Sequence, residues 1–134
     1  MTGLAAEQQL EGKVAIVTGS GRGIGRAVAI KLASYGAKLV INDLDPTVGD
    51  AVVAEIHALG GEAVSCNGNV THPDFAERFI SSATSNFGGL DIIVNNAGYT
   101  WDATIGKATD EQFQAMLDVH LVAPFRILRQ ASAV

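Results

Sequence analysis

The sequence predicts an α/β fold, a doubly wound parallel sheet of the dinucleotide-binding kind, and three observations carry that prediction. Strand-like and helix-like segments alternate along the chain. A glycine-rich run from Thr18 to Gly25 lies between the first such strand and the first such helix. An aspartate, Asp43, ends the second strand-like segment. Alternation of this kind is typical of a parallel sheet with helices on both of its faces.

The expected elements follow one another in a regular order. Apolar runs predict strands over residues 13–18, 37–42, 63–67 and 91–94. Helices are expected over residues 26–34, 46–59, 71–87 and from Thr109 to the C-terminus. Asp45 before Pro46 and the capping-box spacing from Thr109 to Gln112 mark helix starts, whereas Gly36 marks a helix end. Right-handed crossovers then give the spatial order 3-2-1-4, the first half of a Rossmann-type sheet, truncated after the fourth strand and its following helix.

The composition describes one folded domain. A chain of 134 residues that is 48% hydrophobic can bury a sizeable core. Its net charge of −5 disfavours nucleic acid, and no apolar run approaches the roughly 20 residues of a membrane span. We therefore expect a flexible N-terminal tail over residues 1–12, a dinucleotide-binding half-domain over residues 13–134, and no metal site. The single cysteine, Cys66, has no internal disulfide partner, so a reducing, cytoplasmic location is expected.

The glycine-rich turn is the candidate phosphate-binding site. Glycines allow a tight turn and let a pyrophosphate approach the main chain, and the helix that follows directs free N–H groups at the anion. A lone glycine motif also occurs where strands end or helices pack closely, so its position in the first strand–helix turn matters. The residues assigned to the cofactor here are Gly19, Ser20, Gly21, Arg22, Gly23, Ile24 and Gly25.

Asp43, with Leu44 beside it, is the candidate ribose-binding position. A carboxylate at the end of the second strand can accept hydrogen bonds from both adenine-ribose hydroxyls, and it repels a 2′-phosphate. NAD is therefore expected in preference to NADP, with Arg22 the one cation that could attract the phosphate. The alternative is an aspartate that only caps a helix or turn, in company with Asp45.

A second polar group follows the fourth strand, where Asn95, Asn96, Ala97 and Gly98 are consecutive. Two asparagines and two small residues at the carboxyl end of a strand form a polar shelf that could hold a ribose. The alternative is an ordinary turn of the Asn-Gly type.

Together these residues resemble the short-chain dehydrogenase/reductase family, from about residue 10 onward, with similarity to 3-oxoacyl-carrier-protein reductases and hydroxyacyl-CoA dehydrogenases. The matching residues are Thr18, Gly19, Gly23 and Gly25 of the phosphate motif, Asn95 to Gly98 of the second motif, and Asn69-Val70, where the family holds the adenine ring. The resemblance implies NAD-dependent oxidation of a secondary alcohol, or reduction of its ketone. It also implies cofactor contacts from Arg22 and Ile24, and a homo-oligomer formed by the last helix.

The first departure from the family is His120, which stands where the catalytic tetrad has asparagine. Some relatives, among them peroxisomal hydroxyacyl-CoA dehydrogenases, are similar here and also carry histidine. Pro124 has no N–H, so the carbonyl of His120 should lose its helical partner and the helix should kink. In the family, that carbonyl holds a water of the proton relay. The alternative is a semi-buried histidine on an apolar helix stripe.

The second departure is the absence of a Tyr-x-x-x-Lys motif, since neither Tyr35 nor Tyr99 is followed by lysine at the required position. The strand that carries the catalytic serine is absent too, and Ser132 is a poor substitute. We therefore expect these 134 residues to be inactive on their own, although the parent protein is an oxidoreductase. The alternative function is a non-catalytic dinucleotide-binding or oligomerising domain.

Overall fold

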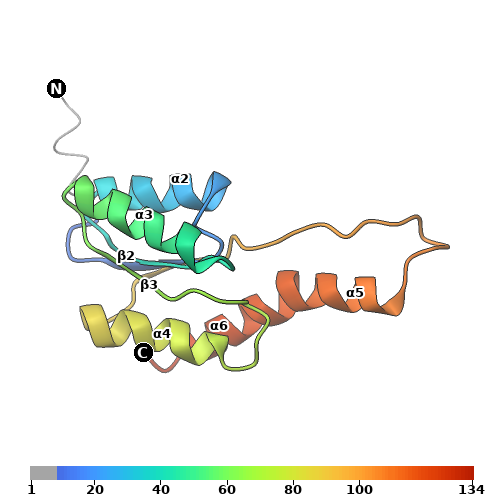
Figure 1. Ribbon diagram of the computed structural model, residues 1–134. Coiled ribbons are helices and arrows are strands. Elements are labelled where there is room, and N and C mark those ends of the chain that lie inside the picture. Colours follow the sequence, from blue (N-terminus) through green and yellow to red (C-terminus); the bar gives the residue numbers. More distant parts are fainter. Residues whose placement is uncertain (1–8) are drawn as a thin grey trace.

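The computed structural model describes residues 9–134 (Figure 1). Its strands are β1 (Val14–Val17), β2 (Lys38–Ile41), β3 (Ala63–Ser65) and β4 (Ile92–Val94). Its α-helices are α2 (Gly23–Ser34), α3 (Pro46–Ala58), α4 (Phe75–Phe87), α5 (Asp110–Leu117) and α6 (Ala123–Ala131), with a π-helical turn η1 (Asp118–Val122) between the last two.

The four strands form one parallel sheet in the order β3-β2-β1-β4, which confirms the expected topology. Val17, the last residue of β1, is level with Ile41 of β2 and Val94 of β4, and Ile41 is level with Ser65 of β3. The strands therefore end together, and the loops that leave them meet at one edge of the sheet.

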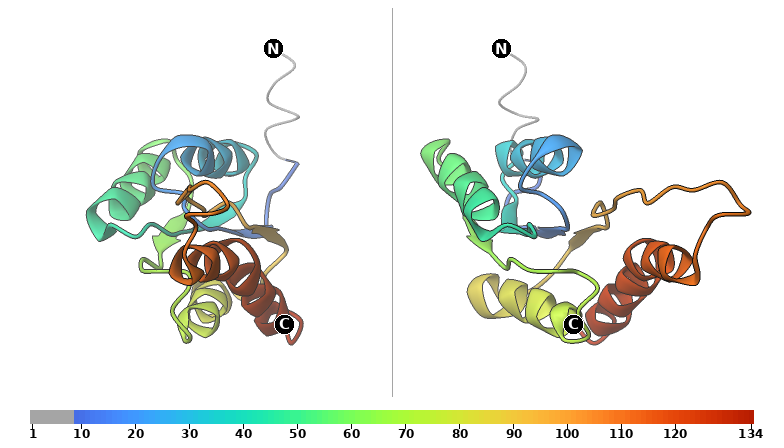
Figure 2. Two further views of the ribbon diagram at one scale, coloured as in Figure 1. Left: turned by 90° about the vertical axis from the view of Figure 1, so that its right-hand side faces the viewer. Right: turned by 45° about the vertical axis from the view of Figure 1, so that its right-hand side comes forward.

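Helices cover both faces of the sheet, as Figures 1 and 2 show: α2 and α3 lie on one face, and α4 and α6 on the other. Successive residues of a strand point to opposite faces, so Ala15 and Val17 join the core under α2 and α3, whereas Val14 and Ile16 join the core over α4. The rings of Phe75 and Phe79 in that second core lie 4.9 Å apart between centroids.

Local capping explains where α3 and α5 begin. The Asp45 side chain accepts the N–H of Thr47, and Thr109 and Gln112 form a reciprocal capping box, as the sequence predicts. The helix expected from Thr71 begins instead at Phe75. The reason is that the Asn69 side chain accepts both the N–H and the hydroxyl of Thr71, at 2.9 and 2.8 Å, which favours a turn over a helix.

The last helix is interrupted where Pro124 predicts a distortion. The N–H of Ala123 donates to the carbonyl of Asp118, five residues back, and the backbone forms the π-helical turn η1. The long loop before α5 extends away from the sheet, and α5 lies beside that loop beyond the sheet's edge (Figure 1).

At the N-terminal end, the tail expected over residues 1–12 lies mostly outside the described residues. Of the rest, Leu10 belongs to the fold, because its N–H donates to Tyr35 at 2.9 Å and its side chain packs against the core under α2. Within residues 9–134, no helix combines the length and the hydropathy that crossing a bilayer requires.

Candidate functional site

A cavity of about 750 Å³ lies at the edge where the strands end. Its walls include the glycine turn after β1, the end of β2, the loop after β3 and the loop after β4. The lining residues that the sequence predicts are Gly19, Arg22, Ile24, Gly25, Asp43, Leu44, Asn69, Val70, Asn96, Ala97 and Gly98. Segments far apart in the sequence thus meet at one polar and apolar surface.

Ser20, Gly21 and Gly23 belong to the glycine turn but do not line the cavity. Ser20 is fully buried, and its hydroxyl donates to the carbonyl of Val17 at 2.8 Å, so it anchors the turn. Gly23 begins α2. Arg22 is the N-cap and makes no side-chain hydrogen bond to the helix, which leaves the first amides of α2 directed toward the cavity edge.

Two glycines of the turn are required by geometry. Gly19 has a φ of +61°, a region that side chains disfavour. A Cβ atom on Gly25 would collide with the Gly19 carbonyl and with the Asn96 side chain. The turn therefore folds back on itself and against the loop after β4. In addition, Ile24 is 77% exposed at the first turn of α2, an apolar side chain presented to the cavity.

The loop after β4 is fixed to the glycine turn by Thr18 and Asn96. The buried Thr18 hydroxyl accepts the N–H groups of Asn96 and Ala97, each at 2.9 Å. In return the Asn96 side chain donates to the carbonyls of Thr18 and Gly19, at 3.0 and 3.1 Å. Asn96 therefore supports the shelf by joining it to the turn.

Asp43 lies between the glycine turn and the start of α3 and is only 7% exposed. Its Oδ1 atom accepts the N–H of Asp45 at 2.9 Å and lies 3.8 Å from the Arg22 guanidinium. A Cβ atom on Gly21 would come within 2.7 Å of the Asp43 Cγ atom, so Gly21 leaves room for this carboxylate. These contacts hold the negatively charged Asp43 side chain at the edge of the cavity.

The loop after β3 carries Asn69 and Val70 and is tied to the opposite face of the sheet, because Arg126 of α6 donates to the carbonyl of Thr71 at 3.2 Å. Two side chains nearby titrate away from their usual ranges. Burial raises the pKa of the Cys66 thiol, while a hydrogen bond from His72 lowers the pKa of the exposed Asp74 carboxyl.

His120 is placed on η1 beside the loop after β4, and it does not line the cavity. Its Nε2 atom lies 2.9 Å from the Tyr99 carbonyl, which accepts only, so Nε2 carries the proton and donates. A Cβ atom on Gly98 would lie 2.6 Å from the imidazole, so the ring stacks closely on this loop. The side chain is exposed, which corrects the semi-buried alternative.

Sequence reasoning misses Asn42, Asn67, Gly68 and Val119. Asn42, Gly68 and Val119 line the cavity. Asn42 is 1% exposed, its Oδ1 accepts the N–H of Gly19 at 3.0 Å, and its Nδ2 donates to the carbonyls of Cys66 and Gly68, each at 3.1 Å. The available signal is a polar amide inside an otherwise apolar strand segment, where burial demands hydrogen-bond partners.

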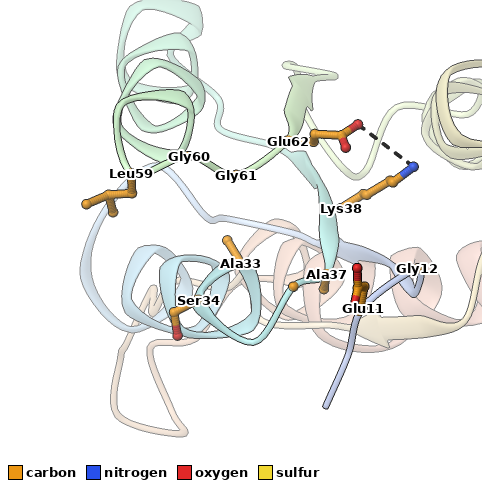
Figure 3. Close-up of a pocket in the computed structure, with 11 residues that line it drawn as sticks. Glu11, Gly12, Ala33, Ser34, Ala37, Lys38, Leu59, Gly60, Gly61 and Glu62 are labelled. Carbon is orange, nitrogen blue, oxygen red and sulfur yellow. Dashed lines mark ion pairs between the residues drawn. The ribbon is translucent and has the colours of Figure 1, made fainter. Parts of the chain in front are cut away.

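A second hollow, of about 570 Å³, lies at the amino ends of the strands. Figure 3 shows Ala33 and Ser34 at the end of α2 and Leu59 after α3 around it, with Lys38 and Glu62 paired on its far side at 3.8 Å. Nucleotides bind parallel sheets at the carboxyl ends of the strands, so the geometry favours the first cavity as the functional site.

Residues 13–134 match the family model described as short chain dehydrogenase. The chain belongs to the short chain dehydrogenase family. Among curated relatives, it is 41% identical to the 3-oxoacyl-[acyl-carrier-protein] reductase of Synechocystis, over 92% of this chain and 50% of that protein. It is 42% identical to the hydroxyacyl-CoA dehydrogenase ChsB1 of Mycobacterium tuberculosis, over 92% of this chain and 40% of that protein.

Solved short chain dehydrogenase structures share the fold. One from Mycobacterium avium superposes with a TM-score of 0.88 at 42% identity, covering 92% of this chain and 46% of the other. A metagenomic short-chain oxidoreductase in complex with NADP has a TM-score of 0.86 at 38% identity, covering 92% and 57% respectively. The chain spans about half the length of the curated relatives named above.

Replacing Thr18 by valine in this short chain dehydrogenase domain should lower the free energy of unfolding by about 1–3 kcal/mol. Valine has a similar shape but no acceptor, so the N–H groups of Asn96 and Ala97 lose their partner. Chemical denaturation measures the change. The matched control is Thr18→Ser, which keeps the hydroxyl; equal stability of the valine and serine variants would contradict this role.

Proposed function

We propose that this chain forms the cofactor-binding half of an NAD-dependent oxidoreductase that acts on a secondary alcohol or its ketone. The observation that carries the proposal is the cavity at the strand ends, with the glycine turn on one side and the Asp43 carboxylate on another. The residues fit a dinucleotide, because the first amides of α2 suit a pyrophosphate and a carboxylate suits a ribose diol. When bound, the nicotinamide would accept or supply the hydride.

The relatives support the reaction class. Their names describe a reductase of a 3-oxoacyl group and a dehydrogenase of a hydroxyacyl group, which are a ketone and a secondary alcohol. We also propose a reducing, cytoplasmic setting, since the single cysteine, Cys66, has no disulfide partner within the chain.

The preference for NAD rests on Asp43. Asp43 is buried and lines the cavity at the end of β2, where we expect the adenine ribose, so a 2′-phosphate bound there would meet like charge. Arg22 opposes this effect, because its guanidinium is largely exposed and lies 3.8 Å from the same carboxylate. We infer that the carboxylate dominates, since it is fixed by its neighbours whereas the arginine must be ordered.

Calorimetric titration should show that the chain binds NAD at least about tenfold more tightly than NADP, a difference of about 1.4 kcal/mol. Asp43→Ala should lower the ratio of the NADP dissociation constant to the NAD dissociation constant, because it removes the negative charge that repels the 2′-phosphate. Glu111→Ala is the matched control, because it deletes an exposed carboxylate on α5 that does not line the cavity. Equal or tighter binding of NADP by the unmodified chain would refute the preference.

We propose that these 134 residues bind cofactor without sustained turnover. A general acid contributes roughly 10²–10⁴-fold to a rate, and the family's tyrosine, lysine and serine have no counterparts in the sequence. The assay follows cofactor reduction with a panel of secondary alcohols, on a sample of verified intact mass. Turnover above that of a Gly19→Asp control would show that the catalytic centre lies elsewhere in the chain.

We also propose that the chain self-associates through the apolar face of its last helical segment. The large exposed side chains of this face are Phe113, Leu121, Phe125 and Leu128. The resemblance to the family implies a second copy as the occupant, and the free edge of β4 offers a further pairing site.

Analytical sedimentation of the chain at tens of micromolar should detect a dimer or larger species. Phe125→Glu should shift the distribution of species toward the monomer. Phe125 is 57% exposed on α6. Ile105→Glu is the control, because Ile105 is 96% exposed but lies in the loop before α5. A monomeric wild-type chain, or equal dissociation by both substitutions, would count against this interface.

A further inference from the structure

The hydrogen-bond ladder between β2 and β3 is interrupted beside Asp43. The ladder includes bonds from Leu39 N–H to the Glu62 carbonyl at 3.0 Å and from Cys66 N–H to the Ile41 carbonyl at 2.8 Å. It resumes with Gly68 N–H to the Asp43 carbonyl at 2.9 Å. Bonds in a parallel ladder are evenly spaced, so the Asp43 N–H is expected to donate to the Cys66 carbonyl.

Two asparagine side chains take the place of that missing bond. The Asp43 N–H donates to the Asn67 Oδ1 atom at 3.0 Å. The Cys66 carbonyl accepts from the Asn42 Nδ2 atom at 3.1 Å. Each main-chain group keeps a partner, and Asp43 is held by a side chain where the regular ladder would have used the main chain.

The remaining polar atoms of Asn67 reach the first turns of α3. Its Nδ2 atom donates to the Asp50 carboxylate at 3.0 Å and to the Pro46 carbonyl at 3.4 Å. A Cβ atom on Gly49 would lie 2.9 Å from the Asn67 Cγ atom, so α3 packs directly against the amide. One side chain therefore joins the end of β2, the start of α3 and the loop after β3.

These contacts fix the two supports of the Asp43 carboxylate. The main chain of Asp43 is held by Asn67 and Gly68, and its Oδ1 atom is held by the N–H of Asp45, at the N-cap of α3. Asn67 contacts Asp43 itself, and it also contacts α3, the helix whose N-cap orients the Asp43 carboxylate. The opposing cation, Arg22, lies on the other side of the same oxygen.

We infer that Asn67 is a positioning residue that sets the choice between NAD and NADP by holding Asp43 in place. This inference rests on the proposed function of Asp43. Without the Asn67 amide, the end of β2 loses one of its restraints, so the Asp43 carboxylate is held less firmly against a 2′-phosphate. Arg22 is then available to pair with that phosphate. Replacing Asn67 should therefore lower the selectivity for NAD over NADP, although Asn67 does not itself line the cavity.

The test measures the dissociation constants of NAD and NADP for the full chain and its variants by calorimetric titration. Asn67→Ala should reduce the NADP-to-NAD ratio of dissociation constants about fivefold, which corresponds to about one hydrogen bond. Asn67→Asp combined with Asp50→Asn should retain the wild-type ratio, because one carboxylate oxygen at position 67 still accepts the Asp43 N–H and the amide introduced at position 50 can donate to the other. Asn86→Ala, on the exposed side of α4, is the control.

A double-mutant cycle separates this role from general destabilisation. If Asn67 acts through Asp43, then Asn67→Ala should leave the ratio unchanged in an Asp43→Ala background. A purely structural role predicts the same change in both backgrounds, and that result would overturn the inference. If Asn67→Ala does not fold, Asn67→Ser replaces it with the same expectation, since the serine side chain is too short to reach the Asp43 N–H.

The outcomes for the two proposals are distinct. If the wild-type chain shows no preference for NAD, or Asp43→Ala leaves the preference intact, the proposed role of Asp43 fails, and the inference fails with it. If Asp43 controls the preference but Asn67→Ala leaves the ratio at the wild-type value, only the role of Asn67 is excluded.

Discussion

The cavity depends on one buried amide, the side chain of Asn42. It is almost completely shielded from solvent, and a buried amide without partners would be costly. Its oxygen accepts the N–H of Gly19, and its nitrogen donates to two carbonyls of the loop after β3. Because Gly19 is joined in turn to the loop after β4 through Asn96, three loops from separate strands share one hydrogen-bond network. The protein's own hydrogen bonds therefore hold the walls of the cavity together.

Electrostatics divide this edge of the sheet into two parts. The start of α2 carries the positive end of a helix dipole and favours a pyrophosphate. The end of β2 carries the negative charge of Asp43, whose carboxylate accepts the main-chain N–H of Asp45 and lies near the exposed Arg22. We propose that the balance between these two side chains decides the response to a 2′-phosphate, and that the asparagine contacts around Asp43 favour the carboxylate.

The sequence predicts the strand order and most of the cavity because apolar periodicity, caps and glycine positions are local signals. It misses the start of α4, where the Asn69 side chain turns the backbone at Thr71. It also misses Asn42 and Asn67, because Asn42 bonds to Cys66 and Asn67 to Asp43, each 24 residues away, and these partners are known only once β2 and β3 are paired. For His120, the helix distortion is predictable from Pro124, whereas the contact with Tyr99 depends on the path of a long loop.

The most direct test of this account is to map the NAD-binding surface of the isotopically labelled chain by NMR. We expect the amide signals of Gly19 to Gly25, Asp43, Asn69 and Asn96 to Gly98 to shift on titration, because these residues surround the cavity at the carboxyl ends of the strands. Signals around Ser34 and Gly60, in the hollow at the opposite ends, should stay unchanged. Shifts confined to that hollow, or none at saturating NAD, would contradict the assignment of the site.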